Sequence, residues 1–436
     1  MSEFIDKVCR AIASCRVEGE GRSLAARAIA DTIGVAAAGF LEPVTTKVEA
    51  LFAGDLQSNW SGTRSDGPQS AALINAIAGH ALDFDDLFVG ASVHPSAVIL
   101  PALLSDGWVV EPDLLIDAYC AGLLAARAVS RRVGRGNRRR GWHGTSVFGI
   151  MAAAAAVGRR NGLGPTELRS ALALAAAQAG GMQINFGTMA KPSHAGFAAA
   201  GGYRAARMAQ AGIDGAPDVF APKGFADLYG EGDGQTDRDE VLASRPELLA
   251  LKLYPCCYGA HRVIALALEA RARLGAEAVR DPTLHFEVIV PIGSMKALRY
   301  GDPKTGLEAK FSAPHTVAIA LMDGAPKIDH FTDEQAARRD LAAMRARIIV
   351  RQAGDPNVPA ELTSGRVRLV VRHGETIVSQ SERTSLPGSP DDPPSQAAVR
   401  AKIGDCLDVF ARERGFAFPM VKSIRAVPEV REWLPD

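Results

Sequence analysis

The sequence has no excess of charge of either sign. Its 436 residues contain 49 Lys and Arg against 49 Asp and Glu. Surfaces that bind nucleic acid or anionic membranes carry a basic excess. We therefore expect neither nucleic acid nor a membrane as a partner, and a near-neutral surface favours the association of like chains.

Cysteine pairs with metal-binding spacing are also missing. The six cysteines are scattered, and the neighbours Cys256 and Cys257 do not suit one disulfide or one metal ion. We interpret all six as reduced thiols of a cytoplasmic protein. Apolar runs long enough to span a membrane are missing as well. The closest candidate, from Val147 to Val157, is too short. The first ten residues predict an amphipathic helix and not a signal peptide.

Motifs for the common cofactors are absent. The sequence has no GxGxxG within a βαβ pattern, no GxxxxGK(S/T) loop and no HExxH. Nicotinamide, nucleotide and zinc-protease chemistry are therefore unsupported, and we expect no cofactor and no metal. One alternative stays open, since the aspartates around residue 85 could hold a divalent cation.

The pattern of apolar residues predicts two kinds of structure, and the length of the chain suggests two domains. Up to about residue 275 apolar residues recur at helical spacing, as at Ile29, Ile33 and Ala37. Beyond residue 283 alternation predicts strands over residues 284–290, 347–351, 366–372 and 375–383, with helices over 313–323 and 333–345. We predict a mainly α protein. A large all-helical domain (residues 1–275 and 396–436) contains an inserted, smaller α+β lid domain (residues 276–395).

Acidic and imidazole side chains gather in one apolar stretch, residues 79–103. Asp83, Asp85 and Asp86 lie within four residues, flanked by His80 and His94. Burying such groups costs free energy unless they are paired or used. We therefore expect chemistry here. As alternatives, Asp85 and Asp86 could cap the next helix or pair with Arg, and His80 could be a hydrogen-bonding residue of its helix.

Further imidazoles and one lysine lie at the starts of other predicted helices. His143, His194 and His261 occupy such positions, and Lys191 opens the helix that contains His194. Helix N-termini attract anions, and the basic segment 131–140 runs directly into the His143 turn. The pattern predicts acid–base chemistry on a small anion, in which an imidazole takes a proton next to a carboxylate that a lysine or amides hold.

Five motifs at these same positions extend over nearly the whole chain. They are G-H-A-L-D-F-D-D followed by H-P-S, G-W-H-G-T-S, N-F-G-T-M-A-K-P-S-H-A-G, Y-P-C-C-Y-G-A-H and E-A-K-F-S-A-P-H-T-V-A-I-A. In these motifs and in their order the sequence resembles the MmgE/PrpD family, which includes 2-methylcitrate dehydratase, cis-aconitate decarboxylase and iminodisuccinate epimerase.

The resemblance implies a helical domain with an α+β lid, a homodimer, and catalysis without a cofactor in a cleft between the domains. By motif it implies that Asp83, His94, His143 and Lys191 are active-site groups, with Lys191 also binding substrate. It implies further that His261, in a segment that borders the site, is catalytic, and that His194 and Lys310 contact the substrate, although the role of Lys310 could be structural.

The sequence departs from the family at Leu87, where dehydratase- and decarboxylase-like members commonly have Thr. If its partner were left unpaired, the loss of a hydroxyl donor would weaken recognition of a citrate-type substrate by about 1–3 kcal/mol. Three hypotheses therefore stay open. The first is a cofactor-independent lyase of the 2-methylcitrate dehydratase type, acting on a small di- or tricarboxylate. The second is an epimerase or a decarboxylase of the same family, and the third is a catalytically silent relative that binds a carboxylate.

Overall fold

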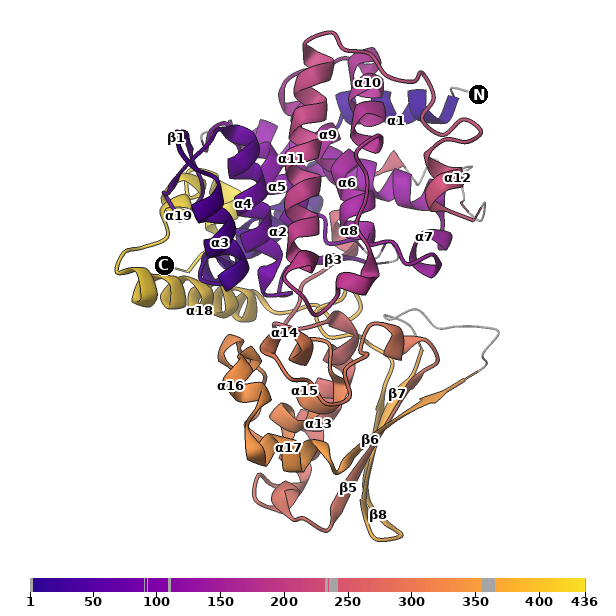
Figure 1. The fold of residues 1–436 in the computed structure, drawn as a ribbon, viewed down its shortest axis with the longest axis vertical. Coiled ribbons are helices and arrows are strands. Elements are labelled where there is room, and N and C mark those ends of the chain that lie inside the picture. The colour runs from indigo at the N-terminus through magenta and orange to yellow at the C-terminus, as the bar shows by residue number, and fades with distance from the viewer. Residues whose placement is uncertain are drawn as a thin grey trace. The chain divides into compact units, whose positions relative to one another are not determined.

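The computed structural model describes residues 3–89, 91, 93–108, 111–231, 234, 242–354 and 365–435. The chain divides into two compact units (Figure 1). Unit 1 consists of Met1–Asn185, Ala190–Leu251 and Ser395–Asp436, and unit 2 consists of Phe186–Met189 and Lys252–Pro394. The chain is mainly helical, as the sequence predicts.

Unit 1 is built from α-helices and two very small sheets. Its longer helices are α1 (Glu3–Ala13), α2 (Gly19–Gly39), α3 (Pro43–Leu51), α4 (Pro68–Ala81), α5 (Ser96–Leu103), α6 (Pro112–Val133), α9 (Gly149–Arg160), α10 (Pro165–Ala176), α11 (Ala190–Gln210) and α18 (Gln396–Arg414). Its short helices are α7 (Gly136–Arg139), α8 (Gly144–Val147), α12 (Phe225–Tyr229), α19 (Pro419–Ile424) and α20 (Pro428–Arg431). The sheets pair β1 (Ala53–Ser58) with β2 (Arg64–Ser65), and β3 (Leu87–Phe88) with β4 (Leu249–Ala250).

Local signals explain where these helices begin and end. The side chain of Glu111 accepts hydrogen bonds from the amides of Asp113 and Leu114 at the start of α6, and Pro112 fills the first helical position. Ser395 caps α18 in the same way, and Gly415 ends it in a left-handed conformation with a φ of 78°.

The core of unit 1 joins segments that are far apart in the sequence. α11 packs on α4 and α9, and α18, from the C-terminal segment, packs on α2 near the N-terminus (Figure 1). The core helices are rich in alanine, and Ala152 to Ala156 of α9 are all buried. Small side chains let helices approach closely, and this brings the helix ends that carry the site residues together.

Unit 2 is an α+β unit around one four-stranded sheet of order β6-β5-β7-β8. Its strands are β5 (Leu284–Pro291), β6 (Ile348–Ala353), β7 (Val367–His373) and β8 (Thr376–Arg383). β5 pairs with β6 in parallel and with β7 antiparallel. Helix α13 (His261–Leu274) packs on β7 and β8, and α15 (Ala313–Met322) packs on β6. The shorter helices are α14 (Gly306–Ala309), α16 (Asp333–Ala336) and α17 (Arg339–Arg345).

The structure differs from the sequence-based expectation at three points. α13 belongs to unit 2, so the division falls after Leu251 and not at residue 275, because the apolar face of this helix covers the sheet. The helix expected over residues 333–345 is split into α16 and α17, because Arg338 is extended with a ψ of 122°. The expected all-helical domain contains the two small sheets of unit 1.

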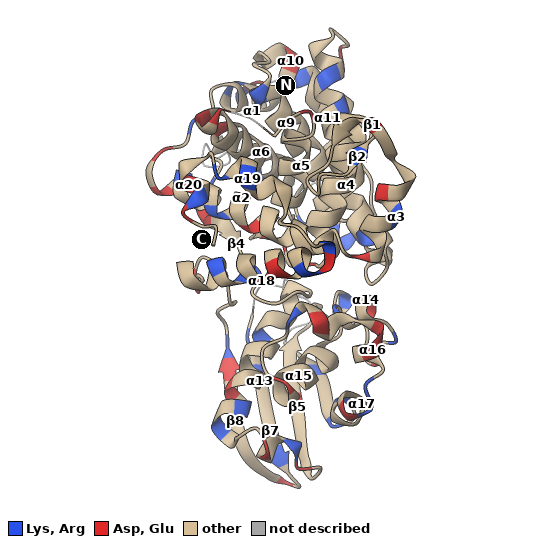
Figure 2. Cartoon of the chain, turned by 90° about the vertical axis from the view of Figure 1, so that its left-hand side faces the viewer, with Lys and Arg blue, Asp and Glu red and all other residues tan. Residues whose placement is uncertain are grey.

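The charges of the chain are not separated by sign. Figure 2 shows Lys and Arg interspersed with Asp and Glu on both units, in agreement with the net charge of zero. No single helix in the described part of the chain is both long and apolar enough to cross a membrane. The helices α2 and α3, with a bend of 83° between them, are long and apolar enough only when they are taken together, and by length and composition alone.

Candidate active site

The candidate site is organised by the acidic turn, Asp83 to Asp86, which joins α4 to β3. α4 ends at Ala81, and the amide of Asp83 donates to the carbonyl of His80 at 3.2 Å. Asp83 has a φ of 51°, which is uncommon for a residue with a side chain. Strained backbone of this kind persists only where the surroundings hold it in place.

Lys191, in the first turn of α11, links two groups of the site. Its Nζ donates to Nε2 of His80 at 2.9 Å and to Oδ1 of Asp83 at 3.0 Å. Because an ammonium group only donates, Nε2 of His80 is an acceptor and the ring proton lies on Nδ1. Nδ1 then donates to Oδ2 of Asp85 at 2.8 Å. The result is a continuous buried chain of contacts from Asp85 through His80 and Lys191 to Asp83.

His94 contacts the same carboxylate from the other side. Its Nδ1 lies 3.2 Å from Oδ2 of Asp85, and its ring centroid lies 4.8 Å from that of His80. The amide of His94 donates to Oγ1 of Thr145 at 3.1 Å, which fixes the loop just before α5. Asp85 is therefore placed to stabilise a proton on His94.

His143 and His194 form a second imidazole pair. Nδ1 of His143, at the start of α8, lies 3.0 Å from Nδ1 of His194, and Nδ2 of Asn185 lies 3.2 Å from Nε2 of His194. The amide nitrogen of Asn185 donates, so Nε2 of His194 accepts and its Nδ1 carries the proton that is donated to His143. The proton of neutral His143 therefore lies on Nε2. The ring of His143 lies 5.8 Å from that of His80, which connects the two groups of imidazoles.

Burial keeps most of these imidazoles neutral. It lowers the pKa of His80 to about 3, and burial together with the Lys191 ammonium lowers the pKa of His194 to about 4. The same two causes hold the pKa of His143 well below its usual value. Burial alone would raise the pKa of Asp85, but contact with His80 and His94 outweighs it and holds the pKa well below the usual value. The site thus combines an ionised Asp85 with neutral His80, His143 and His194.

Four of these residues have donor atoms close enough to hold a metal ion. The donor atoms of His80, Asp83, Asp85 and His94 lie within 4.8 Å of one another. However, the ammonium of Lys191 already lies at hydrogen-bond distance from His80 and Asp83. A divalent ion at this place would be repelled by that ammonium and would have to displace it from both donors. The arrangement therefore favours a lysine-centred site over a metal centre.

His261 and Lys310, which the resemblance also pointed to, lie in unit 2. His261 is fully buried at the start of α13, with Nε2 3.1 Å from the carbonyl of Tyr254, and its ring packs between Tyr254 and Tyr258. Lys310 is 2% exposed, and its carbonyl accepts from the amide of Cys257 at 2.9 Å. These contacts place both residues in the framework of unit 2, and their part in chemistry stays a prediction.

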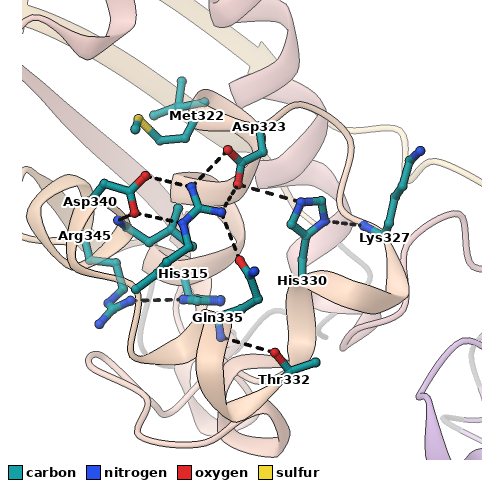
Figure 3. Close-up of polar contacts among 12 residues, drawn as sticks. His315, Met322, Asp323, Lys327, His330, Thr332, Gln335, Asp340 and Arg345 are labelled. Atoms are coloured by element: carbon teal, nitrogen blue, oxygen red, sulfur yellow. Dashed lines mark hydrogen bonds and ion pairs between the residues drawn. The ribbon is translucent and has the colours of Figure 1, made fainter. Parts of the chain in front are cut away.

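Unit 2 also contains a cluster of charged groups that includes Asp323, His330 and Asp340 (Figure 3). Arg338 donates to both carboxylate oxygens of Asp323, at 2.8 and 3.1 Å, and to Asp340 at 2.8 Å. Nε2 of His330 lies 3.7 Å from Asp323, and Nη1 of Arg345 lies 3.2 Å from Nδ1 of His315. These contacts tie α15 and α17 together, so this cluster stabilises unit 2.

The structure brings together the acid, the two imidazoles and the lysine that the sequence singled out, namely Asp83, His94, His143 and Lys191. It adds two groups that sequence reasoning undervalued. His80, taken as an ordinary helix residue, contacts Lys191, Asp85 and the ring of His94. Asp85, for which a helix cap or an Arg partner was considered, instead contacts imidazoles. Asn185 was missed, although it lies in the N-F-G-T-M-A-K-P segment.

Two family descriptions match the chain. The MmgE/PrpD N-terminal domain covers residues 7–237, and the MmgE/PrpD C-terminal domain covers residues 254–417. The chain belongs to the MmgE/PrpD family. The resemblance seen in the five motifs is therefore confirmed, and the matched regions include every residue of the candidate site.

Several relatives in this family are cis-aconitate decarboxylases. The cis-aconitate decarboxylase of Homo sapiens is 28% identical over 380 residues, which cover 82% of this chain and 77% of that protein. The cis-aconitate decarboxylase of Aspergillus terreus is 25% identical over 345 residues, 73% of this chain and 70% of that protein. The cis-aconitate decarboxylase-like protein oryM of Aspergillus oryzae is 26% identical over 367 residues, 78% of this chain and 75% of that protein. Decarboxylases are lyases, so the relatives share the reaction class that the sequence suggested.

Proposed function

We propose that this protein is a cofactor-independent lyase that decarboxylates a small tricarboxylate of the cis-aconitate type. The observation that carries the proposal is the buried ammonium of Lys191, held at 2.9 Å from His80 and 3.0 Å from Asp83 beside two further imidazoles. An ammonium group in this setting can bind a substrate carboxylate, and the names of the relatives supply the substrate class.

The reaction needs a place for charge and a source for one proton. When the bond between the framework and one carboxylate breaks, carbon dioxide leaves and its electron pair stays on the carbon framework. That carbanion then takes up one proton, so a tricarboxylate trianion becomes a dicarboxylate dianion. The site must therefore stabilise negative charge near Lys191 and donate a proton.

His143 is proposed as the proton donor. The hydrogen-bond direction set by Asn185 and His194 places the proton of neutral His143 on Nε2, so this nitrogen can donate a proton and cannot accept one. That tautomer suits protonation of a carbanion better than removal of a proton by His143. In this proposal Lys191 and Asp83 position the substrate, and His94 with Asp85 forms a second acid–base pair.

Dehydration of 2-methylcitrate, the activity that the sequence analysis placed first, is the alternative, and one assay distinguishes it from decarboxylation. Purified protein is incubated with cis-aconitate and, separately, with 2-methylcitrate, in ordinary water and in deuterium oxide. We expect carbon dioxide and a dicarboxylate with one solvent deuteron from cis-aconitate. We also expect EDTA to leave the rate unchanged.

Other results of this assay would replace the proposal. An unsaturated product from 2-methylcitrate, without carbon dioxide from either acid, would favour dehydration. Solvent deuterium in a recovered stereoisomer would favour an epimerase. Thermal stabilisation by carboxylates without any turnover would favour a silent binding relative.

A further inference from the structure

Each residue of the acidic turn is held by a different element of unit 1. Asp83 contacts Lys191 of α11, and Asp85 contacts His80 of α4. Asp86 accepts hydrogen bonds from the amide and the hydroxyl of Ser96, at the start of α5. The fourth residue, Phe84, is held through its backbone carbonyl by a lysine of the C-terminal segment.

That lysine is Lys402 of α18. Its Nζ donates to the carbonyl of Phe84 at 2.8 Å and lies 4.1 Å from the centre of the Phe84 ring. It also pairs with Asp31 of α2, with 2.7 Å between Nζ and Oδ1. Asp31 is fully buried and Lys402 is 9% exposed. One ammonium group therefore ties α2 and α18 to the backbone carbonyl of Phe84, the residue that follows Asp83.

A buried ion pair in this position is poorly explained by stability alone. A protein with apolar side chains of similar volume in place of a buried ion pair is often as stable, or more stable, because both charges of the ion pair lose their hydration on burial. What an apolar side chain cannot supply is a donor for the Phe84 carbonyl together with a cation over its ring. Both contacts fall on the residue next to Asp83, whose φ of 51° needs support from its surroundings.

We propose that Lys402 is a positioning residue that fixes the acidic turn, so that Asp83 and Asp85 meet Lys191 and His80 in the geometry described above. The inference rests on the proposed function for its effect on catalysis. Lys402 acts through the backbone of Phe84 and touches none of the groups proposed to contact the substrate.

The test removes this support together with its partner charge. In the double variant Asp31→Asn/Lys402→Met both charges are lost together, so neither is orphaned. A matched control, Asp106→Asn/Arg160→Met, removes another partly buried ion pair of unit 1, in which Nη1 and Oδ1 are 2.6 Å apart and which does not contact the turn. For each protein kcat, KM and the melting temperature are measured. The tautomers of the histidines are read from nitrogen-15 NMR without substrate.

The double variant is expected to lose about 10- to 100-fold in kcat, because small misplacements of catalytic groups have effects of that size. Its melting temperature should stay close to that of the control variant, and the His80 ring signals should move only in the double variant. Unchanged kcat and unchanged His80 signals in a folded double variant would overturn the proposal.

A second variant covers the case in which the double variant does not fold. Lys402→Arg keeps the charge beside Asp31 but replaces the compact ammonium with a planar guanidinium. It should also lower kcat and shift the His80 signals, and wild-type values for both would again overturn the proposal. If the wild-type protein turns over neither acid, the proposed function fails, and the NMR signals alone decide on Lys402.

Discussion

At the scale of single residues, the direction of the hydrogen bonds matters more than the number of imidazoles. His80 accepts from Lys191 and donates to Asp85, while His194 accepts from Asn185 and donates to His143. Each imidazole is thereby held in one tautomer. Without these partners, either nitrogen of either ring could carry the proton, and no role could be assigned.

Replacement of His143 tests its role as the proton donor. We expect His143→Ala and His143→Asn to lower kcat by about 10²- to 10⁴-fold, the usual contribution of a general acid. Both variants should keep the wild-type circular dichroism spectrum, since the side chain of His143 makes no cap hydrogen bond at the start of the short α8. Full activity in either folded variant would remove His143 from the mechanism.

Asp86 provides a pH-dependent test of the turn. Burial is the main reason that its pKa rises from 3.8 to about 7, and Asp85 and Asp31 add to the rise. Between about pH 4 and about pH 7 the folded state keeps a proton that the unfolded chain has lost. In this window the unfolded state binds fewer protons, so Asp86 makes the free energy of unfolding fall as the pH rises.

Asp86→Asn should remove that loss, because an amide does not ionise. Relative to wild type, the variant should gain stability steadily from about pH 4 to about pH 7 and gain nothing more above it. The gain should reach a few kcal/mol, since one pKa unit corresponds to about 1.4 kcal/mol. Urea unfolding of both proteins at pH 4 and pH 8 measures it, and the difference at pH 4 corrects for altered hydrogen bonds to Ser96. A stability difference that does not change with pH would contradict the account.

At the scale of elements, α11 must approach its neighbours closely for Lys191 to reach the turn. A Cβ added at Gly202 would lie 2.4 Å from the Cβ of Ala153 and 2.6 Å from the carbonyl oxygen of Ile150, both in α9. No other residue type fits this contact without a shift of one helix. Gly202 therefore helps to set the position of α11, whose first turn carries Lys191.

Gly202→Ala should for this reason destabilise unit 1, although alanine is the better helix former. The expected loss is about 1–3 kcal/mol from overpacking. Gly180→Ala is the control, because a Cβ at Gly180 would have nothing within 4 Å. Chemical unfolding of both variants decides the matter, and equal stability of the two would show that α9 and α11 do not constrain each other at this point.

The sequence predicts elements well where their pattern is local. Alternation located all four strands of unit 2 to within a few residues, and helical spacing located α15. The break between α16 and α17 was not predicted, and it falls at Arg338, whose guanidinium contacts Asp323 at the end of α15. In the same way α13 has an ordinary helical pattern, and only its packing on β7 and β8 assigns it to unit 2.

The residues of the site also divide into those that a local sequence pattern indicates and those that matter only through contacts in the fold. Residue type and position drew attention to the acidic stretch with His94 and to the helix starts with His143 and Lys191, and the motifs of the family resemblance then singled out Asp83, His94, His143 and Lys191. His80 was noted beside the acidic cluster but interpreted as a hydrogen-bonding residue of its helix, and Asn185, in a polar loop, was not singled out. Their importance comes from contacts over long sequence distances, such as that of His80 with Lys191.

At the scale of the whole molecule, unit 1 is completed by the C-terminal segment. α18 follows unit 2 in the sequence and packs on α2, where Lys402 pairs with Asp31. Both chain ends are thus needed for one core, and the acidic turn depends on both. A truncation before Ser395 would remove the partner of a fully buried carboxylate.

The association state of the chain is a separate prediction. The near-neutral charge and the family resemblance both favour a homodimer. Light scattering coupled to size-exclusion chromatography should give twice the mass of one chain, and this value should persist on dilution. A single-chain mass at all concentrations would contradict the prediction while leaving the proposed chemistry untouched.

The most direct test of the central claim follows carbon dioxide release from cis-aconitate by wild type and by Lys191→Met. Methionine keeps most of the apolar stem of lysine but carries no charge. We expect release by wild type, with solvent deuterium in the product, and its loss in a Lys191→Met variant that still folds. No release by wild type, or release at the full rate by the variant, would contradict the account of a lysine-centred carboxylate lyase.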